Sequence, residues 1–238
     1  MAHIIDFSKF DEYNRRARLY PALFVVLPLI LGVVVWYPTG FVGLGVLLSI
    51  FVWSGASYLI MEIGRDLGKK KEEELYKQWG GKPTTKFLRY RGAKNRELLA
   101  YTHSKLQALF PDIQLPKIRE EDIDPERADN IYDVCTSRMR ERTRDKNKFR
   151  ILFNENCSFG CRRNLLGMKT WGILSSAAGI IIVDVYFLYG GIFNILAVIT
   201  TVLLFIILLF WTFRITPNWV RTPAEAYAER LFASVENV

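Results

Sequence analysis

The sequence predicts an all-α membrane protein in which two transmembrane helical hairpins bracket a mainly α-helical cytoplasmic domain. Half of the 238 residues are hydrophobic, and the mean hydropathy of +0.11 is high for a soluble domain. Residues 19–61 carry no charged side chain, and residues 170–213 carry one, Asp184. Nearly all of the charge lies between these blocks. This distribution excludes a soluble globular enzyme, a disordered tail and a secreted disulfide-stabilised domain.

Each apolar block is about twice as long as one membrane span, because a bilayer core about 30 Å thick needs roughly 20 helical residues. A Trp-Tyr-Pro-Thr-Gly segment at residues 36–40 interrupts the first block, and Tyr189-Gly190-Gly191 interrupts the second. Proline and glycine favour turns there. The two hairpins cover residues 19–62 and 170–213. The four expected spans are 19–37, 41–62, 170–189 and 192–213.

The basic residues next to the apolar blocks predict how the hairpins are oriented. They occur in the N-terminal segment 1–18, after the second span, before the third span and at Arg214. Both connecting turns carry none. Because basic flanks stay in the cytoplasm, both termini and the middle domain should be cytoplasmic. No small-residue cleavage site follows the first apolar block, so a signal peptide is not expected.

The expected cytoplasmic domain, residues 63–169, carries the basic excess of the chain. Residues 62–169 hold 25 Lys and Arg against 17 Asp and Glu. A helical stalk is expected to end at Gly80, and Asn95 and Asp124 are expected to cap two further helices. The C-terminal segment 214–238 is expected to form an amphipathic helix that starts with a capping box at residues 222–225. Whether this helix lies on the membrane surface or packs on the domain stays open.

A basic residue recurs at every second position near the end of the domain, which makes this run the candidate site for an anionic ligand. An extended chain would place these side chains on one face, whereas a helix would spread them around its axis. A solvated helix end that only flanks the membrane is the competing interpretation. The run consists of Arg138, Arg140, Arg142, Arg144, Lys146, Lys148 and Arg150.

Asp184 is the one ionisable residue inside the expected spans. A carboxylate in the bilayer is costly, and such residues commonly face a cavity or a partner. Asp184 is therefore a candidate for lining a pore or cavity. A hydrogen-bonded or wetted structural acid near the outer boundary is the alternative.

The polar segment 154–164 is expected to be a linker that couples the cytoplasmic domain to the third span. Gly160 would give it flexibility, and Arg162 and Arg163 lie beside the membrane. Catalytic motifs are missing from the sequence, and Cys157 and Cys161 lack the further ligands of a zinc site. We therefore expect no enzyme activity, catalytic residue, metal or cofactor. The acids at residues 120–124 are expected to form a solvated loop before a helix.

The layout resembles the four-helix membrane effectors of bacterial anti-phage operons, whose nucleotidyltransferase partner makes a nucleotide or oligonucleotide signal. It is similar to the Hailong type, an ion-channel effector held shut by single-stranded DNA. This resemblance covers the whole chain as architecture only and carries over no functional residue. It implies an ion-channel or membrane-disrupting effector in the bacterial inner membrane, controlled by a nucleotide or single-stranded DNA.

One four-helix bundle has no room for a conducting path, so a homo-oligomer is expected, with a tetramer favoured by cyclic symmetry. Two other functions remain open. The first is a membrane scaffold that recruits a cytoplasmic partner protein through the basic domain. The second is a transporter subunit that uses Asp184 as its polar site, although four helices are few for a transporter.

Overall fold

The structure is a computed structural model, and within the residues that it describes it contains helices and no strand. The described residues are 11–36, 45–46, 50, 55–190 and 194–238. The chain divides into two compact units. The apolar unit comprises Met1–Glu72 and Gly160–Val220, and the polar unit comprises Glu73–Phe159 and Arg221–Val238.

This division differs from the expected cytoplasmic domain of residues 63–169. Three helices contribute residues to both units: α4 (Ala56–Trp79), α9 (Arg150–Gly167) and α12 (Pro217–Ala233). The second half of α9, from Gly160 on, belongs to the apolar unit. The C-terminal residues of the chain, Arg221–Val238, belong to the polar unit. The spacing of residues along the chain could not reveal this assignment to the two units, because the assignment depends on which distant helices pack together.

Three helices among the described residues are long and apolar enough to cross a membrane. They are Glu12–Val34, Lys169–Gly190 and Ile195–Arg214. They correspond to the spans expected at 19–37, 170–189 and 192–213. Half of the fourth expected span, 41–62, lies outside the described residues. Helix α4 begins at Ala56 within this span and ends at Trp79, next to the expected end of the stalk.

The first of these helices joins three segments, and the third joins two. The segments of the first are α1 (Glu12–Asn14), a π-helical turn η2 (Arg15–Leu19) and α2 (Tyr20–Val34). The second is α10 (Lys169–Gly190), and the third joins α11 (Ile195–Leu209) to the π-helical turn η3 (Phe210–Arg214). The Asn194 side chain caps α11 by accepting from the Leu196 N–H at 2.9 Å.

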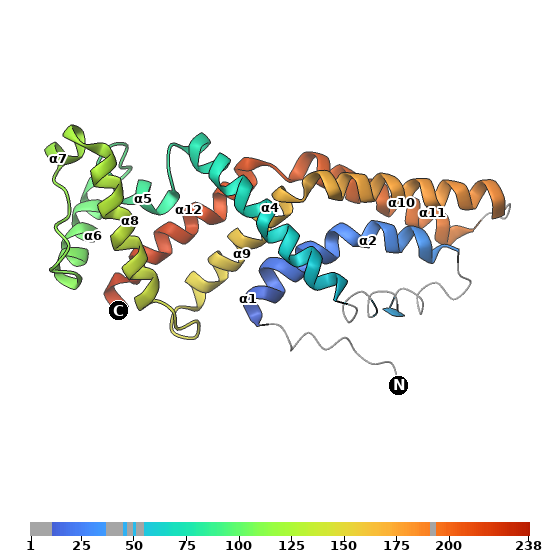
Figure 1. Cartoon of the computed structure of the whole chain (residues 1–238), viewed down its shortest axis with the longest axis horizontal. Coiled ribbons are helices and arrows are strands. Elements are labelled where there is room, and N and C mark those ends of the chain that lie inside the picture. The colour runs from blue at the N-terminus through green and yellow to red at the C-terminus, as the bar shows by residue number, and fades with distance from the viewer. Residues whose placement is uncertain (1–10, 37–44, 47–49, 51–54, 191–193) are drawn as a thin grey trace. The chain divides into compact units, whose positions relative to one another are not determined.

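Glycines let α2, α10 and α11 pack closely in the apolar unit, where the three helices lie side by side (Figure 1). A Cβ on Gly179 of α10 would lie 2.5 Å from the Pro28 carbonyl oxygen of α2. A Cβ on Gly172 would lie 2.1 Å from the fully buried Trp211 ring. Small residues allow such close approach between membrane helices, so Gly179 serves packing within one chain.

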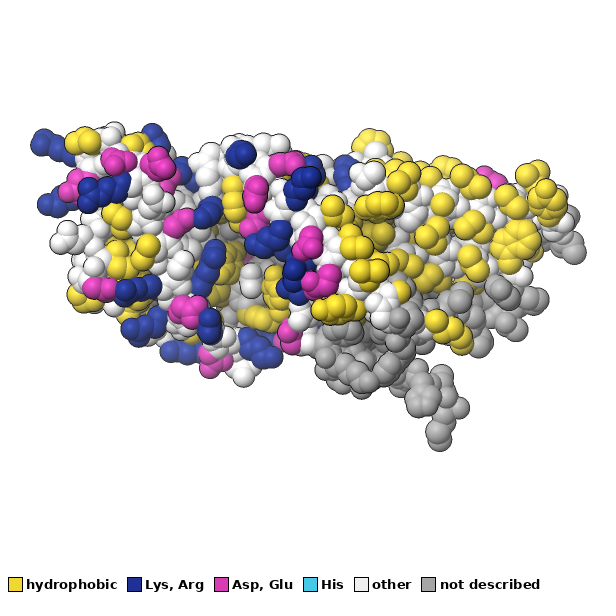
Figure 2. Space-filling model, in the orientation of Figure 1, with side chains coloured by type: hydrophobic (Ala, Val, Ile, Leu, Met, Phe, Trp, Pro, Cys, Tyr) yellow, Lys and Arg dark blue, Asp and Glu magenta, His cyan; other side chains and the backbone are white. Residues whose placement is uncertain are grey.

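The same helices expose apolar side chains on their outer surface. Figure 2 shows hydrophobic side chains over much of the visible face of α10 and α11. Exposed examples are Ile181, Leu188, Ile199, Ile206 and Phe213. An apolar surface of this extent is unusual for a soluble monomer and is typical of contact with lipid or another chain.

The polar unit is a small helical domain with its own core. Its further helices are α5 (Pro83–Leu88), α6 (Arg96–Leu109), α7 (Ile118–Ile123), α8 (Pro125–Arg142) and η4 (Ser234–Asn237). The expected caps are confirmed: Asn95 accepts from the Leu98 N–H and Asp124 from the Arg127 N–H, each at 3.0 Å. The core includes Leu88, Leu106, Phe110, Tyr132, Met139, Leu231 and Phe232.

The C-terminal helix α12 packs in the polar unit, which decides between the two placements left open by the sequence. Leu231 and Phe232 are fully buried in its core. The predicted capping box at residues 222–225 is wrong, because α12 already begins at Pro217 and Pro223 lies inside it. Glu225 instead forms an ion pair with Arg221 one turn earlier, at 2.7 Å.

Candidate functional site

The basic run does not form one face, because the chain there is neither extended nor a single helix. α8 ends at Arg142, a turn follows, and α9 begins at Arg150. Arg138 donates two hydrogen bonds to Asp112, at 3.0 and 2.5 Å, and Arg144 donates to Glu141 at 2.8 Å. The Arg140 guanidinium lies 6.0 Å from the centre of the Tyr227 ring. These arginines therefore contact different elements.

The remaining members of the run lie around the turn and on the start of α9. The Lys148 amine lies 5.2 Å from the Phe149 ring centre, and the Arg150 guanidinium lies 5.6 Å from that of Phe153. Arg142 and Lys146 are exposed. These side chains offer dispersed surface charge rather than a formed binding site.

Asp184 lies on the outer surface of α10. Its neighbour Val183 is fully buried against Val35 and Leu204, whereas Asp184 is exposed. Within the described part of the chain, Asp184 has no hydrogen bond or ion pair. Its carboxylate is therefore presented away from the core of its own unit, among apolar side chains.

The expected coupling linker is a helix, which corrects the expectation of flexibility at Gly160. Residues 154–164 lie inside α9, and the peptide hydrogen bonds of a helix fix the backbone at Gly160. A Cβ on Gly160 would lie 2.9 Å from the Tyr13 hydroxyl and 3.0 Å from the Cβ of Ala17. Gly160 therefore permits close packing against the first helix of the apolar unit.

Arg162 and Arg163 hold this part of α9 to its neighbours. Arg162 donates to the Trp219 carbonyl at 2.9 Å, and its guanidinium lies 4.9 Å from the Trp219 ring centre. Arg214 lies on the same ring at 5.5 Å. Arg163 is buried and donates to Glu72 of α4 at 2.5 Å.

The Arg163 contact extends into a polar cluster between three helices. Arg163 also donates to the Asn164 side-chain oxygen at 3.2 and 3.0 Å, and Asn164 donates to the Ala17 carbonyl at 2.8 Å. Burial would raise the pKa of Glu72, but the Arg163 and Lys69 charges outweigh it, so this pKa lies below its ordinary value. Residues 160–164 are thus held by polar contacts to the other helices of the apolar unit.

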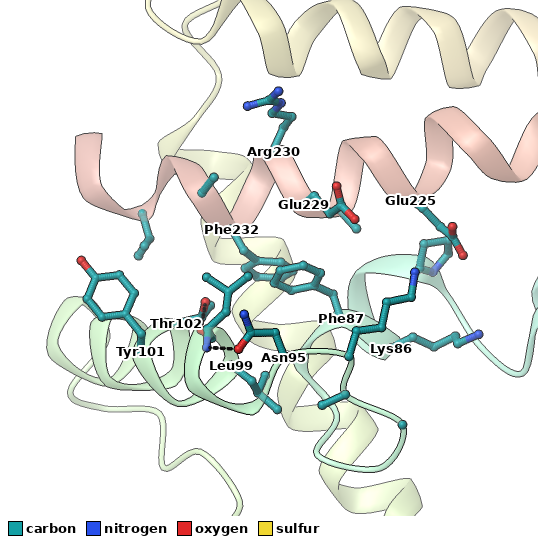
Figure 3. A pocket seen from close by; sticks show the side chains of 18 of the residues that line it. Lys86, Phe87, Asn95, Leu99, Tyr101, Thr102, Glu225, Glu229, Arg230 and Phe232 are labelled. Carbon is teal, nitrogen blue, oxygen red and sulfur yellow. Dashed lines mark hydrogen bonds between the residues drawn. The ribbon is translucent and has the colours of Figure 1, made fainter.

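The polar unit contains a cleft that sequence reasoning missed. It lies between the residues 92–95 that precede α6 and the C-terminal helix α12, with a volume of about 650 Å³. The rings of Phe87 and Phe232 meet in its middle, and Lys86 and Asn95 lie beside them (Figure 3). The sequence signalled the cap at Asn95, but nothing in it indicated that residues 130 positions further on would form the opposite wall.

A buried polar network holds the polar unit together beneath these helices. The sequence-based expectation of a solvated acidic loop is wrong for Glu121, which lies on α7 and is only 3% exposed. Its carboxylate accepts hydrogen bonds from the Tyr90 and Arg91 N–H groups, at 2.9 and 3.0 Å, and from the Tyr132 hydroxyl at 2.8 Å. Burial and this bond to Glu121 raise the pKa of Tyr132.

His103 completes the network with its two ring nitrogens. Nε2 lies 2.8 Å from the Leu88 carbonyl oxygen, which can only accept, so Nε2 carries the proton. Nδ1 then accepts from the Tyr90 hydroxyl at 3.0 Å. Burial lowers the pKa of His103 below its ordinary value of 6.5, so the ring stays neutral in the folded protein at neutral pH.

The lowered pKa of His103 predicts that acid destabilises the polar unit. The unfolded chain binds a proton at His103 more readily than the folded chain, so stability should fall as the pH drops below about 6.5. Thermal unfolding of the full chain between pH 7.5 and 5.5 measures this slope. His103→Gln should flatten this dependence of stability on pH. An equal slope for wild type and His103→Gln would contradict the assignment.

The fold and composition define an α-helical protein with a separate polar unit and, among the residues that the structure describes, three potential membrane spans. No protein-family model, curated protein or solved structure matches the chain. The function must therefore be argued from the residues and their geometry.

Proposed function

We propose that this chain is an oligomeric membrane effector of bacterial anti-phage defence, acting as an ion channel or by disrupting the inner membrane. The apolar unit would form the membrane assembly, most simply a tetramer, with residues 41–62 as its fourth span. The polar unit and both termini would face the cytoplasm. There the polar unit would respond to a nucleotide or single-stranded DNA made by a nucleotidyltransferase partner.

The observation that carries the membrane part of this proposal is the position of Asp184. The residue is exposed on a helix of membrane-spanning length, and the described residues of its own unit give it no polar partner. Hydrocarbon would penalise an exposed carboxylate by several kcal/mol. Copies of the chain arranged around an axis would remove this penalty, because the carboxylates would then line a shared aqueous path.

The buried cluster around Arg163 supports communication within such an assembly. α9 is one continuous helix from Arg150 to Gly167, and its second half is fixed to α4 and to the first helix of the apolar unit. In this proposal, a ligand bound to the polar unit would act on the membrane assembly through α9, which contributes residues to both units. The apolar outer surface of α10 and α11 would contact lipid or a neighbouring copy.

Asp184→Asn should remove most of the cation preference of the channel while leaving its assembly intact. Rings of carboxylates attract cations into a pore, and asparagine keeps the shape of the side chain without its charge. Reversal potentials in planar bilayers under a KCl gradient measure the preference, and mass photometry in nanodiscs measures the assembly. The control is Glu126→Gln, which removes an exposed acid from the polar unit.

The two measurements separate the parts of the proposal. A monodisperse monomer, or a wild-type protein that neither conducts nor permeabilises membranes, would contradict the effector. Conduction with the same ion preference in wild type and Asp184→Asn would contradict the role of Asp184 in the pore.

A further inference from the structure

The cleft of the polar unit has the size and the lining of a small-molecule site. Its volume of about 650 Å³ falls within the range of roughly 300–1,000 Å³ that ligand pockets occupy. Aromatic and aliphatic side chains form its middle. The rings of Phe87 and Phe232 are stacked, with centroids 5.3 Å apart and planes 12° from parallel. Leu98 also lines the cleft and is half exposed.

Positive charge gathers at one end of this cleft. Lys86, Lys94 and Arg221 all line it. Lys86 donates to the Trp79 carbonyl oxygen, and Arg221 pairs with Glu225. Burial lowers the pKa of Lys86, and the positive charge of Arg221 adds to that effect. Lys94 is exposed and has no partner in the described part of the chain. Glu225 and Glu229 also line the cleft, and the Glu225 charge offsets part of the repulsion on Lys86. An anion would offset more of it.

The other end of the cleft offers a hydrogen-bond acceptor. The Tyr101 hydroxyl donates to Oε1 of Glu236 at 2.6 Å, which leaves Oε2 of that carboxylate open to a second donor. Figure 3 shows Tyr101 at one end of the cleft and Lys86 with Glu225 at the other. Arg230 also lines the cleft, and Figure 3 shows its side chain on the opposite side of α12 from Phe232.

We propose that this cleft binds a small amphipathic anion, with a planar ring against Phe87, Phe232 and Leu98 and a phosphate or carboxylate at the cationic end. A nucleoside monophosphate has this form, because its base offers a flat ring with amine donors for Glu236 and its phosphate lies at the far end. An aromatic carboxylate shares the ring and the anion. The volume encloses one such molecule and does not enclose a polynucleotide.

Isothermal titration of the full-length protein in detergent tests this site. The probes are AMP, 2-naphthoate, adenosine and inorganic phosphate. We expect AMP or 2-naphthoate to bind, and adenosine and phosphate to bind at least about tenfold more weakly, because each lacks half of the recognised group. AMP alone would identify a nucleotide site, and 2-naphthoate alone would identify an aromatic carboxylate site.

Two variants remove the two halves of the site without touching a buried residue. Lys94→Glu should weaken binding of the ring-bearing anion by about tenfold or more. Leu98→Glu should do the same, and it places an acid in the first turn of α6, where helices favour one. The matched control is Lys146→Glu, an exposed lysine of the basic run outside the cleft, which should change the affinity by less than about twofold.

Two results would overturn the proposal: no binding of either ring-bearing anion at millimolar concentration, or equal affinities for wild type, Lys94→Glu and Leu98→Glu. The inference deepens the ligand control proposed above, yet binding is measured without any membrane current. Binding at the cleft with no effect of the ligand on conductance would refute ligand control and leave the cleft site standing.

Discussion

Arg163→Met should destabilise the apolar unit by about 3 kcal/mol, because it leaves the partly buried Glu72 carboxylate without its main partner. The side chains of Arg163 and Glu72 are only 6% and 13% exposed, and the guanidinium also makes two hydrogen bonds to Asn164. Methionine fills similar volume but donates nothing. Lys69 still contacts Glu72 at 3.0 Å in this variant. The expected loss of unfolding free energy is therefore at the lower end of the range for a broken buried ion pair. Thermal unfolding of the full chain in detergent measures it.

A double-mutant cycle separates the pair from its surroundings. The double variant Glu72→Gln/Arg163→Met should lose less stability than the sum of the losses in the two single variants, because the unpaired charge of Glu72 is then gone. The surface control is Arg65→Met. Arg65 pairs with Glu62 at 2.7 Å but is 40% exposed, so its loss should be below about 1 kcal/mol. Similar losses for Arg65→Met and Arg163→Met would contradict the role assigned to burial.

The elements that could be predicted from the sequence are those set by local composition and local hydrogen bonds. The apolar spans at 170–189 and 192–213 follow from a long stretch of sequence with a single charge and from the Gly-Gly pair within it. The caps at Asn95 and Asp124 follow from side chains that bond to amides three residues away. In each case the energy that decides the structure comes from residues within one or two helical turns.

The errors occur where distant contacts override a local pattern. Gly160 suggested flexibility, but neighbouring peptide bonds keep it helical, and the approach of Tyr13 explains the missing side chain. The basic run alternated as a strand would, yet a turn after Arg142 divides it between two helices. The cleft depends on α12 packing against α5 and α6, which no local signal encodes.

Glu121 is a further contact that the sequence did not reveal. Glu121→Ala should lower the free energy of unfolding of the polar unit by about 3 kcal/mol. Three donors lose their acceptor at once: two backbone N–H groups that precede α6 and the hydroxyl of the fully buried Tyr132. Each buried donor left without a partner costs about 1–3 kcal/mol, and water entering the vacated volume offsets part of that cost. Urea unfolding of the full chain in detergent measures the change.

The neighbouring acid provides the matched comparison, because Asp122 lies on the same helix and is exposed. Asp122→Ala should change stability by less than about 0.5 kcal/mol, and equal losses for the two alanine variants would contradict a structural role for the buried carboxylate. Tyr132→Phe removes one of the three donors and should cost about 1 kcal/mol. Glu121→Gln should restore little of the stability that Glu121→Ala loses. The amide oxygen of glutamine can accept from one backbone N–H, but its amide nitrogen then faces the other. A carboxylate can accept from all three donors at once, and this requirement explains why an acid is buried here.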